Sequence, residues 1–103
     1  MTKTDFVKEN NKLVIYLYGE IDHHGANKIK DTIDYEIMTT NPEIVVMNFS
    51  NITFMDSSGI GLVLARLKIA ESCNAKLYVE GVDKSIGKIL ALAGIKTIQN
   101  IKI

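Results

Sequence analysis

The stretch Ile52-Thr53-Phe54-Met55-Asp56-Ser57-Ser58-Gly59-Ile60-Gly61 separates two segments with contrasting hydrophobic patterns. Before it, the apolar run at residues 44–49 is typical of a buried strand. After it, apolar residues recur at the spacing of one helix face: Ile60, Val63, Leu64 and Leu67. The stretch therefore predicts a strand-to-helix corner, capped by Asp or Ser side chains that accept hydrogen bonds from the first helical turn. Such a corner presents two hydroxyl groups at the positive end of a helix dipole, which suits a phosphate.

The chain before this corner predicts a hairpin. Residues 6–9 and 12–18 are rich in β-branched, aromatic and other apolar residues, as strands are. Asn10-Asn11 between them can form a tight turn, because Asn tolerates positive φ. Gly19 is expected to end the second strand.

A helix should follow this hairpin after a polar loop at residues 20–25. Its apolar stripe is predicted from four residues: Ala26, Ile29, Ile33 and Ile37. Asp22 is a candidate cap at or near its start. Asn41-Pro42 is expected to end the helix, since proline disfavours helical backbone in the residue before it.

The chain after the corner predicts two further units. The corner helix should reach about Glu71 and turn out at Asn74, before a strand at residues 76–80 that Gly81 ends. A third helix is indicated by apolar residues at helical spacing: Ile86, Ile89, Leu90 and Ala93. Gly94 would follow that helix, and residues 95–103 read as a last strand. The order β-β-α-β-α-β-α-β predicts an α/β fold, with a mixed sheet, an N-terminal hairpin and crossover helices.

Length and composition indicate one domain spanning residues 1–103, with 47% hydrophobic and 23% charged residues. Lys plus Arg and Asp plus Glu number 12 each, which argues against a general nucleic-acid binder. No apolar run approaches a membrane span, and no signal-peptide pattern opens the chain. The single cysteine, Cys73, excludes an intramolecular disulfide and fits a reducing compartment. We therefore expect a cytoplasmic protein without a membrane association.

Catalytic interpretations of the serines are poorly supported. A nucleophile elbow needs Gly-x-Ser-x-Gly, whereas Met55 stands where the first glycine should be. The only histidines, His23 and His24, lie upstream, although a triad is defined by space and not by order. A small serine hydrolase therefore remains as an alternative.

Cofactor and metal sites are likewise not indicated. Residues 81–89 resemble a phosphate-binding loop, but one residue too many separates the glycines, and Ile89 replaces the hydroxyl residue that would hold magnesium. The adjacent His23 and His24 lack a metal-ligand spacing and read as surface histidines. We predict no cofactor and no metal. Local chemistry alone favours a plain helix cap for the serine corner.

Two segments together resemble the anti-sigma factor antagonist family, small cytoplasmic proteins of the STAS domain type. One is Tyr18-Gly19-Glu20-Ile21-Asp22-His23-His24. The other is Phe54-Met55-Asp56-Ser57-Ser58-Gly59-Ile60-Gly61, followed by Arg66 and Lys68 on the helix. The pattern Gly-Glu-hydrophobic-Asp-His-His is most similar to the sporulation members, which act on the anti-sigma-F factor. The resemblance covers nearly the whole chain and implies a single STAS domain, whose order of elements agrees with the one above.

This resemblance implies a phosphorylation switch without enzymatic activity. The unphosphorylated protein would bind an anti-sigma factor that is also a serine kinase, and a sigma factor would be released. The kinase would phosphorylate Ser57, and a phosphatase would reverse the step. The implied partner-binding residues are Asp22, His23, His24, Asp56, Ser57, Ser58, Gly59, Ile60 and Arg66. The free protein is expected to be a monomer that makes no direct contact with nucleic acid.

Two further points concern the family: a difference at the end of this chain and a second known use of the fold. Similar proteins commonly carry a further helix after the last strand, whereas this chain stops at Ile103. STAS domains also serve as scaffolds or antagonists in general stress pathways, where the same serine would meet another kinase. That role is the alternative within the fold.

Overall fold

The computed structural model describes residues 1–98, and the predicted alternation of strands and helices is confirmed there. The elements in chain order are β1 (Lys3–Glu9), β2 (Lys12–Ile21), α1 (His23–Thr40), β3 (Ile44–Met55), α2 (Ser57–Ser72), β4 (Lys76–Glu80), α3 (Lys84–Leu92) and β5 (Lys96–Ile98). Within this part of the chain, five strands form one sheet in the spatial order β1-β2-β3-β4-β5. β1 pairs with β2 antiparallel, and every later pair is parallel, so the sheet is mixed as predicted. Of the last strand predicted at residues 95–103, the part after Ile98 lies outside the described residues.

The N-terminal hairpin turns at Asn10-Asn11, where Asn10 has the left-handed φ of 54° that the sequence suggested. The expectation that Gly19 ends the second strand is wrong, because β2 continues to Ile21. Gly19 has a φ of 89°, and a Cβ there would collide with the Met1 carbonyl group. Glycine thus allows close passage of the first residue while the strand continues through a shift in register against β3.

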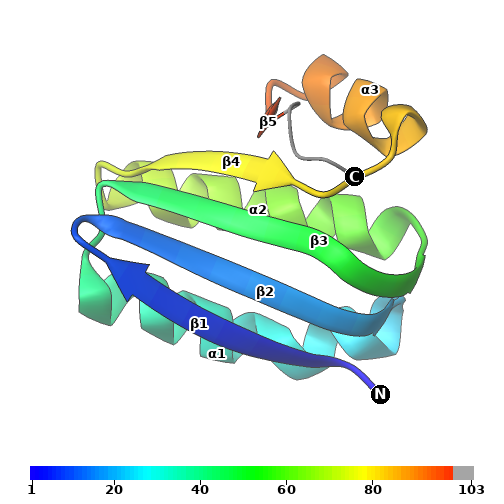
Figure 1. The fold of residues 1–103 in the computed structure, drawn as a ribbon, viewed down its shortest axis with the longest axis horizontal. Coiled ribbons are helices and arrows are strands. Elements are labelled where there is room, and N and C mark those ends of the chain that lie inside the picture. Colours follow the sequence, from blue (N-terminus) through cyan, green and yellow to red (C-terminus); the bar gives the residue numbers. More distant parts are fainter. Residues whose placement is uncertain (99–103) are drawn as a thin grey trace.

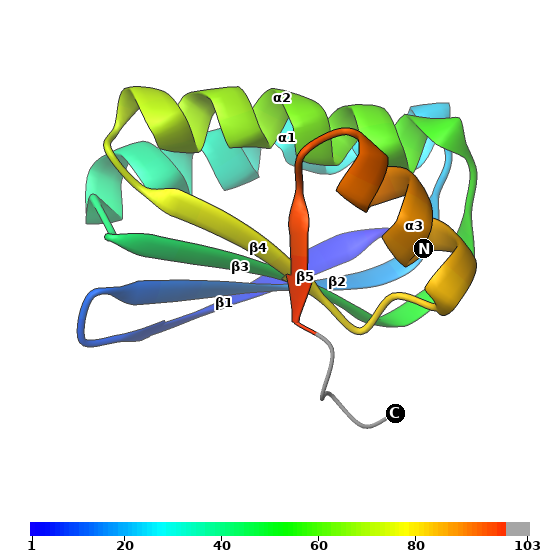
Figure 2. The same ribbon diagram turned by 90° about the horizontal axis from the view of Figure 1, so that it is seen from above.

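Two helices, α1 and α2, cover one face of the sheet and enclose the main core (Figure 1, Figure 2). The side chains with no or almost no exposure in this core come from α1, α2 and the strands: Leu13, Ile15, Leu17, Ile29, Ile33, Ile37, Val45, Met47, Leu62, Val63, Leu77 and Val79. The stripe predicted for α1 is confirmed at its three isoleucines. Burial of these side chains supplies the main favourable free energy of folding.

The buried face of α2 differs from the predicted one. Val63 is fully buried as expected, but Ile60, Leu64 and Leu67 are only partly buried and lie beside the core. The centre of the buried face includes Leu62, Val63, Arg66 and Ala70. The hydrophobic spacing did not predict this buried face, because one of its residues, Arg66, is charged and is buried as part of an ion pair with Asp34.

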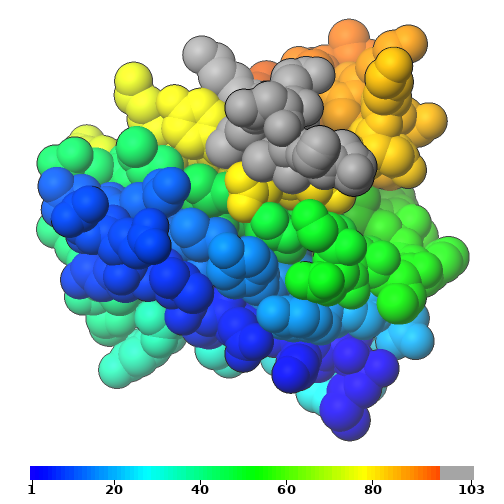
Figure 3. Space-filling view, in the orientation of Figure 1, coloured from blue at the N-terminus to red at the C-terminus, as the bar shows by residue number. Residues whose placement is uncertain are grey.

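The opposite face of the sheet is the one seen in Figure 3, and short stretches of it are also buried. Val14, Val46 and Asn48 are each less than a tenth exposed. α3 lies beside the strands β4 and β5 (Figure 1). Within α3, Leu90 is completely buried, whereas Ile89 is 44% exposed. Within residues 1–98, no helix has both the length and the apolar character needed to cross a membrane.

Candidate functional site

The carboxyl ends of the parallel strands β2, β3 and β4 lie at one edge of the sheet, where α1, α2 and α3 begin (Figure 1). This arrangement follows from the crossover connections, which return each helix to the start of the next parallel strand. In open α/β sheets this edge is the usual place for ligand and partner sites. The serine corner lies here.

Two aspartates cap the neighbouring helices α1 and α2 at this edge. Asp22 Oδ1 accepts a hydrogen bond from the Gly25 N–H at 2.7 Å, and Asp56 Oδ1 accepts one from the Ser58 N–H at 2.8 Å. The Asp56 N–H also donates to the Ile21 carbonyl oxygen at 3.4 Å. This bond places the two caps side by side, so two carboxylates and two helix N-termini share one small surface. Both predicted caps are confirmed.

The two serines occupy the first turn of α2. Ser57 is the first helical residue and is exposed, whereas Ser58 is partly buried. Gly59 is buried, and a Cβ at this position would collide with the Met55 side chain at the end of β3. Gly59 therefore packs closely against Met55, while Ser57, two residues earlier, is exposed.

The two histidines occupy the first turn of α1. His23 and His24 are the first two residues of that helix, and both are exposed. They follow the cap Asp22 directly. The structure therefore brings Asp22, both histidines, Asp56 and both serines to one edge. Their contact with a partner, which the family resemblance implies, stays a prediction.

The remaining predicted site residues have different positions. Gly59 is buried against Met55 beneath the surface, and Ile60 is partly buried against the core. Arg66 is 6% exposed and does not belong to the surface: its Nε lies 2.8 Å from Asp34 Oδ1, and its Nη2 donates to Asp34 Oδ2 at 3.3 Å. Arg66 therefore joins α2 to α1 inside the protein, and this position does not support its predicted contact with a partner.

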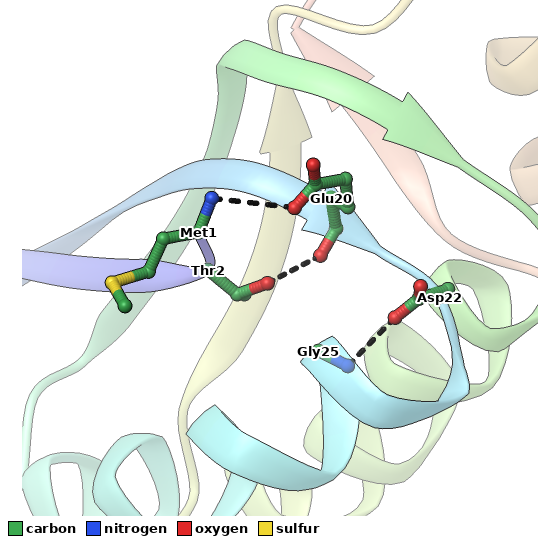
Figure 4. Close-up of polar contacts among 5 residues, drawn as sticks. All are labelled: Met1, Thr2, Glu20, Asp22 and Gly25. Carbon is green, nitrogen blue, oxygen red and sulfur yellow. Dashed lines mark hydrogen bonds and ion pairs between the residues drawn. The ribbon is translucent and has the colours of Figure 1, made fainter.

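The N-terminus supports the first turn of α1 from outside the helix. The Thr2 hydroxyl group donates to the Glu20 carbonyl oxygen at 2.7 Å, and the Met1 amino group lies 3.4 Å from Glu20 Oε1 (Figure 4). Thr2 is only 7% exposed. No motif in the sequence marks this contact, because its partners are separated by most of the hairpin.

A shallow hollow with a volume of about 350 Å³ adjoins the serine corner. Its apolar lining comes from the end of β3 and from the region where α3 begins: Phe49, Ile52, Phe54, Met55, Val82 and Ile86. Met55 belongs both to this hollow and to the packing of Gly59. The sequence did not indicate the hollow, since the β3 residues that line it continue the strand beyond the predicted end at Phe49.

Two observations concern the metal and catalytic interpretations of the site. Within residues 1–98, no group of three or more His, Cys, Asp or Glu side chains could hold a metal ion. In the same part of the chain, no side-chain hydrogen bond joins Ser57 to a histidine; the capping bonds described above are instead bonds to the backbone. The arrangement is that of an exposed serine at the first residue of a capped helix.

Comparison with known proteins gives the corner a context. A family model described as the STAS domain matches residues 3–102. The anti-sigma F factor antagonist of Paenibacillus polymyxa is 32% identical over 83 residues, which cover 81% of this chain and 71% of that protein. The anti-sigma-B factor antagonist of Staphylococcus aureus is 28% identical, with 81% and 76% covered.

Solved structures agree with this likeness. The anti-sigma factor antagonist SpoIIAA in its unphosphorylated form matches with a TM-score of 0.77 and 28% identity, covering 96% of this chain and 88% of that one. The phosphorylated form of the Bacillus cell fate determinant SpoIIAA matches with a TM-score of 0.75 at the same identity, covering 95% and 89%. The fold described above is therefore similar to both states of a protein that is phosphorylated.

Proposed function

Because the chain belongs to the STAS domain family, we propose that it is an anti-sigma factor antagonist, a binding protein without catalytic activity. Its unphosphorylated form binds an anti-sigma factor that is also a serine kinase, and a sigma factor is thereby released. The whole chain, residues 1–103, acts as one STAS domain in the cytoplasm. It works as a monomer when free, without a cofactor and without direct contact to nucleic acid or membrane.

Ser57 is the proposed phosphate acceptor. The single observation that supports this role best is its exposed position as the first residue of α2, beside the Asp56 cap. A kinase can reach such a hydroxyl group without unfolding the helix. A phosphatase that acts on phosphoserine 57 would restore the binding form.

The proposed partner surface consists of residues that share the edge with Ser57: Asp22, His23, His24, Asp56, Ser58, Gly59 and Ile60. A phosphate on Ser57 would add a charge of about −1.5 to −2 near neutral pH. Within the protein this charge would lie at the positive end of α2, where an anion gains roughly 0.3–1 kcal/mol. At an interface it would have to be desolvated next to the carboxylates of Asp22 and Asp56, so binding should weaken.

A second candidate is an antagonist or scaffold in a general stress pathway. The observation that favours it is the 28% identity with the anti-sigma-B factor antagonist of Staphylococcus aureus. The same surface and the same serine would then serve another kinase. Competition between the two possible anti-sigma partners for the purified protein would separate these pathways.

The deciding experiment is intact-mass analysis with peptide mapping, after incubation with ATP and the anti-sigma factor kinase of the same genome. One phosphate on Ser57 is the expected result. A phosphate on Ser58 would move the acceptor by one residue. A complex without any phosphate would contradict the switch, and the absence of both would contradict the antagonist role itself.

A further inference from the structure

Thr2 reaches the candidate site from an element that carries none of the predicted site residues. It directly precedes β1, whose antiparallel pairing brings the start of that strand to the carboxyl end of β2. Thr2 is 7% exposed, and its hydroxyl group donates to the Glu20 carbonyl oxygen at 2.7 Å (Figure 4). A buried hydroxyl group with one defined acceptor marks a specific contact.

Gly25 completes this contact from the side of α1. A Cβ at Gly25 would collide with the Glu20 carbonyl oxygen and would lie 2.6 Å from Thr2 Oγ1. The backbone of the first helical turn therefore packs directly on both partners of the Thr2 hydrogen bond. The Gly25 N–H meanwhile donates to the cap Asp22 at 2.7 Å, as Figure 4 shows.

These contacts join three elements beneath one short turn. The start of β1, the end of β2 and the first turn of α1 meet at Thr2, Glu20 and Gly25. The turn carries Asp22 and the exposed His23 and His24 on its outer side. The backbone of Ile21, between Glu20 and the turn, accepts the bond from the Asp56 N–H and so extends the same framework to the serine corner.

We propose that Thr2 is a positioning residue for partner binding, which holds the turn at residues 22–25 in the orientation that the anti-sigma factor kinase recognises. This inference rests on the proposed function. The likeness to known proteins does not supply it, since the family model begins at residue 3. The turn and its histidines, not Thr2 itself, contact the partner.

Loss of the Thr2 hydroxyl group should destabilise the turn at residues 22–25 while the rest of the protein stays folded. The Glu20 carbonyl oxygen would lose a buried donor, and a partly buried group without its partner is unfavourable. The turn would then populate other arrangements, and the apparent affinity falls by the fraction of molecules that remain competent to bind. We expect Thr2→Val, which keeps the shape of the side chain, to raise the Kd for the kinase about tenfold.

The test uses the full chain with three substitutions. Thr2→Val removes the hydroxyl group, and Thr2→Ser restores it without the methyl group. Thr40→Val is the matched control, because the Thr40 hydroxyl group also donates to a backbone carbonyl oxygen, that of Glu36 at 2.6 Å, at the far end of α1. Two quantities are measured well below the unfolding temperature: the Kd for the anti-sigma factor kinase of the same genome, and amide hydrogen exchange at Gly25.

The expected result is faster exchange at Gly25 together with weaker binding in Thr2→Val, with both reversed in Thr2→Ser and absent in Thr40→Val. Unchanged exchange, unchanged affinity, or an equal loss of affinity in Thr40→Val would each overturn the proposal. If the wild type binds no kinase, the proposed function fails. The exchange of Gly25 then decides separately whether Thr2 holds the turn.

Discussion

Gly59 and Gly61 lie two positions apart in α2, yet the same substitution should have different effects on them. A Cβ on Gly59 would collide with the Met55 side chain, whereas a Cβ on Gly61 would meet no atom within 4 Å. Gly61→Ala should raise the free energy of unfolding by about 1 kcal/mol, because alanine has the higher helix propensity. Gly59→Ala should be less stable than Gly61→Ala by about 1–3 kcal/mol, the usual effect of overpacking.

Urea unfolding of both glycine variants checks this prediction. Gly61→Ala also serves as the control for the propensity gain, which both variants share. Equal stability of the two would show that Met55 moves aside freely, in which case Gly59 does not fix the serine corner.

The charge of residue 57 should decide partner binding. Ser57→Ala should bind the anti-sigma factor kinase with wild-type affinity and accept no phosphate, because only the hydroxyl group is lost. Ser57→Asp should bind about tenfold or more weakly, since a carboxylate next to Asp56 must be desolvated at the interface. Titration calorimetry measures both affinities.

Ser72→Asp is the control for this pair, because it places the same charge on the last residue of the same helix, far from the corner. It should leave the affinity unchanged. Weakening by Ser72→Asp as strong as that by Ser57→Asp would point to net charge and not to a local contact.

At the scale of elements, the Asp34 and Arg66 ion pair connects α1 and α2. The Arg66 side chain is 7% exposed and that of Asp34 is 20% exposed. Asp34→Ala should destabilise the protein by about 3 kcal/mol or more, because a buried guanidinium group would remain without its partner. The double variant Asp34→Leu/Arg66→Met should lie close to the wild type, since a well-packed apolar pair avoids the desolvation of two charges.

A double-mutant cycle by urea unfolding, with Asp34→Leu and Arg66→Met as the single variants, measures this coupling. An interaction energy near zero between the two positions would mean that the helices pack independently of the ion pair.

The same pair predicts a pH dependence. Burial raises the pKa of Asp34 above 3.8, and Arg66 offsets this shift only in part. The folded protein therefore keeps the proton to a higher pH than the unfolded chain does. The stability that this proton contributes is complete below pH 3.8 and is lost as the pH rises through the folded-state pKa.

Asp34→Asn isolates this contribution, because the amide does not titrate. As the pH rises above 3.8, the unfolding free energy of the wild type should fall relative to that of Asp34→Asn. The neighbours Asp31 and Lys30 act on Asp34 in opposite directions and are present in both proteins. A difference that stays constant with pH would contradict the raised pKa.

The sequence predicted the ends of elements that depend on neighbouring residues. It did not predict features that depend on contacts between residues far apart in the chain. Asn41-Pro42 ends α1 and Asp56 caps α2, because backbone preference and capping act within a few residues. The continuation of β2 through Gly19 rests on pairing with β3, which is remote in sequence. The same holds for Arg66, whose burial depends on Asp34 in another helix.

The site shows the same division. The family resemblance implied that Asp22 and the serine corner are neighbours, and the structure brings them together because the parallel strands β2 and β3 end at the same edge. The supporting contact of Thr2 and the hollow beside Met55 followed from no local pattern. Both join segments that only the complete sheet brings together.

For the molecule as a whole, phosphorylation should leave the fold intact. The chain matches SpoIIAA about equally well in its unphosphorylated and phosphorylated forms, with TM-scores of 0.77 and 0.75. A phosphate on Ser57 would lie at the N-terminus of α2, where an anion is favourable by less than about 1 kcal/mol. We therefore expect the unfolding free energies of the phosphorylated and unmodified proteins to differ by no more than about 1 kcal/mol.

The two forms differ in charge and can be purified from each other by ion exchange, and thermal unfolding of each then checks this expectation. Loss of partner binding with unchanged stability would support a switch by local electrostatics. A large loss of stability would instead mean that the modification melts the start of α2.

The strands of the sheet lie side by side in the order in which a ribosome makes them. Each strand from β2 onward pairs with the strand synthesised just before it, so no strand must wait for a later one to fill a gap. Domains tend to fold from the N-terminus during synthesis. By the time residue 72 has emerged, β1, β2, α1, β3 and α2 are present, and these elements with the loops between them carry all the predicted site residues. The serine corner can thus assemble while β4, α3 and β5 are still to be translated.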